Sequence, residues 1–135
     1  MTAPSNNGYL LLFRGTDWHL ELSPEEIQEV MSQWGDWFTR LKQNGKLLTG
    51  SPLENEGYVV SGRNRAVADG PFAESKEAVG GYFFLKVDTA EEAIEIAKEC
   101  PALPHGLRVE VRAVAPACPV EKALGGSFIE HAMAS

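Results

Sequence analysis

The order of helix-like and strand-like patterns constrains this chain more than any other feature. Two segments with helical periodicity, residues 23–44 and 89–100, are each flanked by short apolar runs typical of strands. A hairpin pattern separates the two β-α-β units. The chain has 135 residues, which suits a single domain. Few strands, with two helices that can each cover a sheet face, predict an α+β domain of the ferredoxin-like kind.

The first helix has a clear start and a clear stop. Ser23 is a cap residue followed by proline, and Glu26 completes a capping box. The Asn44-Gly45 step is a good stop. Gly35 inside the helix costs about 1 kcal/mol relative to alanine, which predicts the close approach of another element. The apolar residues recur at three- and four-residue steps and predict the inner face: Ile27, Val30, Met31, Trp34, Phe38 and Leu41.

Short apolar or alternating runs predict the strands at residues 8–14, 46–50, 57–61, 65–69, 81–87 and 107–114. The third and fourth form a hairpin around Gly62-Arg63-Asn64. Gly80-Gly81 predicts a bulge or a close backbone approach. The second helix starts with a capping box of Thr89 and Glu92 and ends before Pro101. Its predicted inner face is Ala90, Ala93, Ile94 and Ala97.

Composition excludes several classes of protein. A net charge of −7 and a pI of about 4.9 argue against binding to nucleic acid or to an anionic membrane surface. We find no signal peptide and no apolar run near the roughly 18 residues of a membrane span. Two cysteines make neither a disulfide framework nor a zinc site, and the three histidines are scattered. We therefore expect a cytoplasmic protein without metal or cofactor, in which Cys100 is structural.

The densest polar stretch is residues 69–77, DGPFAESKE, which Gly80-Gly81-Tyr82 follows. This motif and its flanks resemble the DGPF branch of the YCII-related proteins over residues 8–116. The resemblance implies a ferredoxin-like subunit that pairs through its sheet as a dimeric α+β barrel, with a cleft between sheet and helices. We expect a domain at residues 1–116. The tail, residues 117–135, is expected to form a short helix that packs on the domain or on the partner subunit of a homodimer.

The motif and the flanking strands supply candidate site residues. Asp69 is assigned as a general acid or base, Lys76 as the group that stabilises an anion, and His105 as a proton relay for Asp69. For each of the first two an ordinary alternative stands: Asp69 as a turn cap and Lys76 as part of a solvated ion-pair cluster. Trp34 is assigned to core packing. The predicted contacts to a small-molecule substrate are Arg14, Trp18, Trp37, Phe72 and Tyr82.

The resemblance supplies no agreed reaction. Shorter YCII proteins are thought to use a histidine of the first helix with an aspartate, and that place falls near Trp34 in a helix without histidine. Two hypotheses follow. The first is a small cofactor-independent enzyme that acts on an aromatic or enolisable metabolite. The second is a non-catalytic ligand-binding or accessory protein, because DGPF-type proteins are often found beside extracytoplasmic-function sigma factors.

Overall fold

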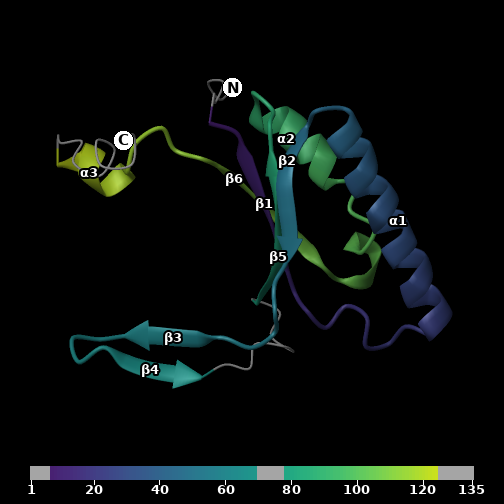
Figure 1. Ribbon diagram of the computed structural model, residues 1–135, viewed down its shortest axis with the longest axis horizontal. Coiled ribbons are helices and arrows are strands. Elements are labelled where there is room, and N and C mark those ends of the chain that lie inside the picture. The colour runs from purple at the N-terminus through teal and green to yellow at the C-terminus, as the bar shows by residue number, and fades with distance from the viewer. Residues whose placement is uncertain (1–6, 70–77, 125–135) are drawn as a thin grey trace.

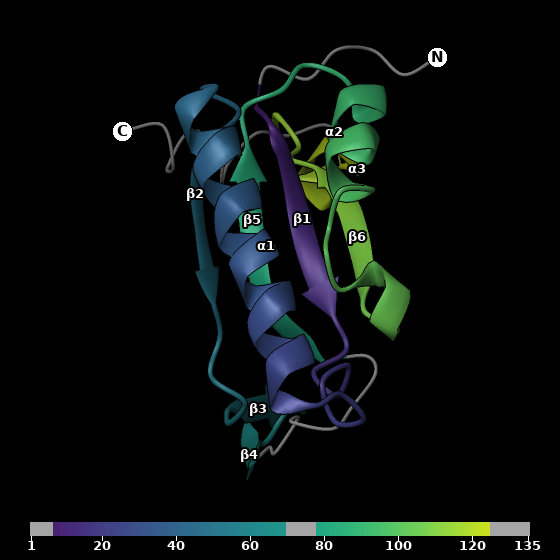
Figure 2. The same cartoon turned by 90° about the vertical axis from the view of Figure 1, so that its right-hand side faces the viewer.

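A computed structural model of the chain describes residues 7–69 and 78–124 (Figure 1). Four strands form an antiparallel sheet in the order β2-β5-β1-β6. Their bounds are β1 Tyr9–Arg14, β2 Leu47–Pro52, β5 Val79–Leu85 and β6 Arg108–Ala113. Helices α1 (Pro24–Gln43) and α2 (Ala90–Ala97) cover one face of this sheet (Figure 2). The fold is therefore α+β and ferredoxin-like, as the sequence predicts.

The second β-α-β unit is preceded by a hairpin that stands apart from the sheet. Strands β3 (Tyr58–Ser61) and β4 (Ala66–Asp69) pair only with each other among the described strands. The hairpin projects from the side of the sheet opposite α1 and α2, and the short α3 (Pro119–Ala123) lies on that same side (Figure 1). A 3-10 turn, η1 (Leu103–His105), precedes β6. No helix in the described ranges is long and apolar enough to cross a membrane.

Local capping explains where the two helices begin. The Ser23 side chain accepts a hydrogen bond from the Glu26 backbone N–H at 3.1 Å, and the Glu26 carboxylate accepts one from the Ser23 N–H at 2.9 Å. This is the predicted capping box. At α2 only half of the predicted box forms. Thr89 caps the Glu92 N–H at 3.2 Å, but the Glu92 carboxylate accepts from Lys46 instead.

The core lies between the sheet and the helices, and Leu11, Trp37 and Leu85 are its largest fully buried side chains. The predicted inner face of α1 is partly wrong. Trp37 is buried and Met31 is 52% exposed, because the buried stripe is centred on the positions of Val30, Trp37 and Leu41. The predicted inner face of α2 is also partly wrong: Ile96 is buried, and Ile94 is 42% exposed.

The Gly80-Gly81 pair forms the predicted irregularity at the start of β5. Phe13 pairs with Gly81 and Arg14 with Val79, so Gly80 is an extra residue in the ladder. The strand runs from Val79 to Leu85, two residues earlier than the predicted 81–87, because the bulge keeps both glycines in the sheet. This irregular end of the sheet lies under the middle of α1, where it helps to form a cavity.

Candidate functional site

A cavity of about 510 Å³ opens between α1 and the end of the sheet. The helix contributes one wall, with Met31, Trp34, Gly35, Phe38 and Thr39. The ends of β1 and β2 and the start of β5 form the floor, and the loop after β1 closes one side. The cleft between sheet and helix that the family resemblance implies is therefore present.

Aromatic side chains from α1, the sheet and the loop after β1 line the cavity: Phe13, Trp18, Trp34, Phe38 and Phe83. Phe13 of β1 and Phe83 of β5 meet edge to face on the floor, with ring centroids 4.9 Å apart and an interplanar angle of 87°. Trp34 of α1 contacts Phe13 edge-on at 5.0 Å. Trp18, from the loop after β1, stacks near Trp34 at 6.5 Å with an angle of 26°. Flat apolar rings that line a cavity can stack on a flat ligand.

Glycines shape the floor where strands and loop approach closely. A Cβ on Gly81 would lie 3.0 Å from the Ser51 carbonyl oxygen. A Cβ on Gly80 would lie 3.1 Å from Cγ2 of Thr16, and one on Gly50 would lie 2.7 Å from Cδ1 of Phe83. The predicted close backbone approach at Gly80-Gly81 is confirmed. Because these positions carry no side chain, the neighbouring strands and the loop after β1 can lie close together at the floor of the cavity.

The polar groups on the cavity surface are few and uncharged or weakly basic. They are Thr16, His19, Thr39 and Ser51. Among the described residues, none that lines the cavity is an aspartate, glutamate, lysine or arginine. His19 lies edge-on to Trp18 at 5.6 Å. A histidine at the rim of an apolar cavity can donate or accept a hydrogen bond and can transfer a proton.

Comparison with known protein families identifies the chain. Residues 8–126 match the YCII-related domain, which is most of the sequence. The chain belongs to the YCII-related family. No curated protein matches it. The family resemblance seen in the DGPF motif is thus confirmed at the level of the YCII-related family, and the match extends ten residues beyond the predicted domain end at 116.

The two tryptophans of α1 differ in burial in this YCII-related protein. Trp37, predicted to contact a substrate, is 2% exposed and lies in the core. Its Nε1 donates to Oε1 of Glu99 at 3.0 Å, and Arg40 donates to the same oxygen. Trp34, predicted to pack in the core, is partly buried against the core and also lines the cavity. Trp18 lies in the cavity wall.

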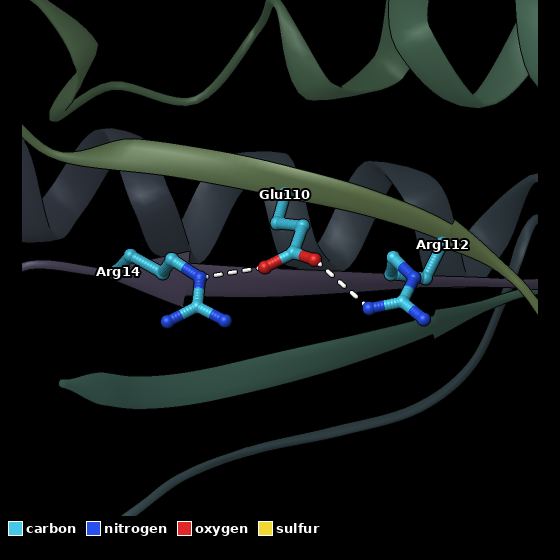
Figure 3. Close-up of polar contacts among 3 residues, drawn as sticks. All are labelled: Arg14, Glu110 and Arg112. Carbon is cyan, nitrogen blue, oxygen red and sulfur yellow. Dashed lines mark hydrogen bonds and ion pairs between the residues drawn. The ribbon is translucent and has the colours of Figure 1, made fainter. Parts of the chain in front are cut away.

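Arg14 and Tyr82 lie on the face of the sheet that carries no helix. In β1 the buried residues alternate with Arg14, so its side chain points away from the cavity. Arg14 Nε donates to Oε1 of Glu110 at 2.6 Å, and Arg112 donates to Oε2 at 3.0 Å (Figure 3). These bonds, the Arg14 bond first, hold the pKa of the Glu110 carboxyl below its usual value. Tyr82 is opposite Leu12 on the same face.

The predicted catalytic residues are not brought together in the described part of the chain. Asp69 is the exposed last residue of β4, paired across the hairpin with Tyr58. His105 lies beside Trp18, with ring centroids 6.4 Å apart, and faces a second, more polar hollow. No hydrogen bond joins these two described residues. Lys76 and Phe72 lie outside the described residues, so their roles stay predictions.

Sequence reasoning missed Thr16 and His19 as cavity residues. Both follow β1 in a loop that folds back under α1, and no local pattern indicates that path. The signal available was their position just after a buried strand, where loops often carry function.

Cys100 is buried just beyond the end of α2. This burial raises the pKa of its thiol to about 11, so the thiol stays protonated and unreactive.

Proposed function

We propose that this YCII-related protein binds a small, flat, uncharged metabolite in the cavity between α1 and the sheet. The observation that carries the proposal is the aromatic slot formed by Trp18, Trp34 and Phe13 over a glycine floor. A volume of about 510 Å³ lies within the range of small-molecule sites, roughly 300–1,000 Å³. Stacked rings bury large apolar areas and favour a planar ligand over a branched one.

The lack of charge on the described lining supports an uncharged ligand. Moving an ionised group from water to an apolar site is costly unless an opposite charge is present. Arg14, predicted to clamp an anion, is engaged by Glu110 on the far face of the sheet. His19, Thr39 and Ser51 line the cavity and can form hydrogen bonds with a hydroxyl, a carbonyl or a ring N–H of a ligand.

Catalysis in the same cavity is the second candidate. His19 lines the cavity, and the chain that follows the DGPF stretch enters the floor directly, where the Ala78 carbonyl accepts from the Gly15 N–H at 2.9 Å. A proton transfer by His19, with Asp69 or Lys76 as partner, would give a cofactor-independent enzyme. Binding without turnover would suit an accessory or regulatory protein.

We expect two-ring neutral compounds such as indole and 2-naphthol to raise the melting temperature. A ligand at a hundredfold its dissociation constant adds about 2.7 kcal/mol, a shift of several degrees for a domain of this size. The Trp34→Ala variant should lose the shift, because that ring forms a cavity wall. Ile94→Ala, which removes an exposed apolar side chain of α2 outside the cavity, should keep it. Equal shifts in both variants would contradict the proposed site.

Incubation of the same compounds with the protein separates turnover from binding. Product formation that His19→Gln or Asp69→Asn abolishes, while the thermal shift persists, would establish an enzyme. A shift without any product would support a binding protein. Naphthoate serves as the charged control for 2-naphthol, and preferential binding of naphthoate would contradict the uncharged ligand.

We also propose that two copies pair through the sheet face without helices. Leu10, Leu12, Tyr82 and Phe84 alternate with core residues on β1 and β5 and are only half-buried on this face. The hairpin projects from one end of this face and α3 lies toward the other end (Figure 1). A second sheet can therefore fill the space between them. The charge alternates in sign along the row Arg14, Glu110 and Arg112. Such a row can pair with a second copy of itself.

The hairpin adds a second reason for a partner. Every residue of β3 and β4 is exposed, including Tyr58 at 76% and Val60 and Val67 at 63% each. A two-stranded hairpin alone is marginally stable in water. Apolar side chains on such an arm are typical of a surface that another subunit covers.

We expect the protein to be a dimer at micromolar concentration by light scattering. Val60→Asp should raise the dimer dissociation constant at least about tenfold, because a charge on the arm is costly to bury. Ile94→Asp makes the same kind of change on the helix side, at a residue that is 42% exposed, and should leave the dimer intact. A monomeric wild type, or equal effects of the two variants, would contradict the interface.

A further inference from the structure

Gly35 occupies a position in α1 that favours almost any other residue. It lies near the middle of a continuous helix, Pro24–Gln43, where glycine is the poorest helix former after proline. The prediction that another element approaches the helix closely at Gly35 is wrong. Among the described residues, a Cβ at Gly35 would meet no atom within 4 Å outside its chain neighbours and the helix's own backbone. Packing against the described part of the chain therefore does not explain the glycine.

The position of Gly35 is explained by the cavity. Met31 and Thr39, one turn to either side, line the same cavity, as do Trp34 and Phe38. These four side chains surround a place where the helix presents only backbone. Gly80 and Gly81 line the same cavity from the sheet side.

The geometry points to Gly35 as the residue that sets the size of ring the cavity accepts: the hollow left by its missing side chain holds the second ring of a planar, uncharged two-ring ligand. This inference rests on the proposed function. Trp34 and Phe38, one helical turn apart, lie on the same side of Gly35 and offer flat apolar rings beside the hollow. Met31 is 52% exposed at its edge, and the flexible thioether can cover a ring edge of varying shape. Among the described residues that line the cavity none is charged, so a charged group would have no ion-pair partner from them.

The test is a shift in ligand preference that has the opposite sign to the shift in stability. Binding of 2-naphthol and phenol is measured by calorimetry on the wild type, Gly35→Ala and Gly35→Leu. We expect the ratio of 2-naphthol affinity to phenol affinity to fall a few-fold in Gly35→Ala and at least about tenfold in Gly35→Leu. Over the same series the ligand-free protein should melt higher, by about 3 °C for Gly35→Ala, because alanine favours the helix and nothing obstructs its methyl group.

Ser32→Ala is the matched control, because Ser32 is exposed on the same helix and does not line the cavity. It should raise the melting temperature slightly and leave the affinity ratio unchanged. An unchanged ratio in Gly35→Leu, with 2-naphthol still bound, would overturn the role of Gly35 and leave the proposed function standing. A lower melting temperature in Gly35→Ala would show that the glycine has a structural role. No binding of either compound by the wild type would overturn the proposed function and this inference together.

Discussion

Replacing Trp37 by alanine should lower the free energy of unfolding by about 3–5 kcal/mol, the range for a large aromatic removed from a core. The side chain is 2% exposed and contacts three other rings. Its ring centroid lies 4.9 Å from that of Phe83, 5.9 Å from Trp34 and 6.0 Å from Phe13. Its removal leaves a void among these rings and an exposed Glu99 without its indole donor. Urea denaturation followed by circular dichroism measures the loss.

Trp34→Ala is the control for this prediction, three residues away on the same helix. Its ring also contacts three others, but it is only partly buried and lines the cavity, so solvent can enter the space that its removal leaves. We expect a clearly smaller loss of stability, together with the loss of ligand binding described above. A loss at Trp34 as large as that at Trp37 would mean that the cavity wall is part of the core, and would contradict the assignment of the two rings.

The topology of this protein was predictable because its signals are local. Ser23 and Glu26 cap a helix through bonds between residues three apart, and the Gly-Arg-Asn turn joins two strands that are adjacent in sequence. With the helices and strands placed, the ferredoxin-like order follows from short connections and one-sided helix packing. The family match over residues 8–126 agrees with that prediction.

The site was harder to predict because it depends on which surface each element turns toward its neighbours. Trp34 and Trp37 both lie within the wide apolar stripe of one helix, and helical periodicity does not say which of them meets the sheet and which meets a cleft. Alternation in β1 separates Phe13 from Arg14, but it does not say which face the helices cover. His19 and Thr16 come from a loop whose path under α1 has no local signal.

Gly8→Ala should destabilise the fold by roughly 2–4 kcal/mol, which combines backbone strain with a steric clash. Gly8 has a φ of +84°, a left-handed conformation that non-glycine residues rarely adopt. A Cβ there would lie 2.6 Å from the Leu85 carbonyl oxygen and 2.7 Å from Cε1 of Phe84. The Gly8 carbonyl also accepts from the Val114 N–H at 3.0 Å. The residue therefore has little freedom to move away from the clash.

Gly45→Ala separates the two contributions, because Gly45 also has a positive φ, +72°, but a Cβ there would meet no atom of the described residues within 4 Å. It should cost only the conformational strain, about 1 kcal/mol. The difference between the two variants in chemical denaturation then measures the clash at Gly8 alone. Equal losses would show that the start of β1 can move away from β5. In that case the end of the sheet opposite the cavity would be adaptable. The rigid floor that the proposed ligand needs would then have to be maintained by the Gly80-Gly81 bulge alone.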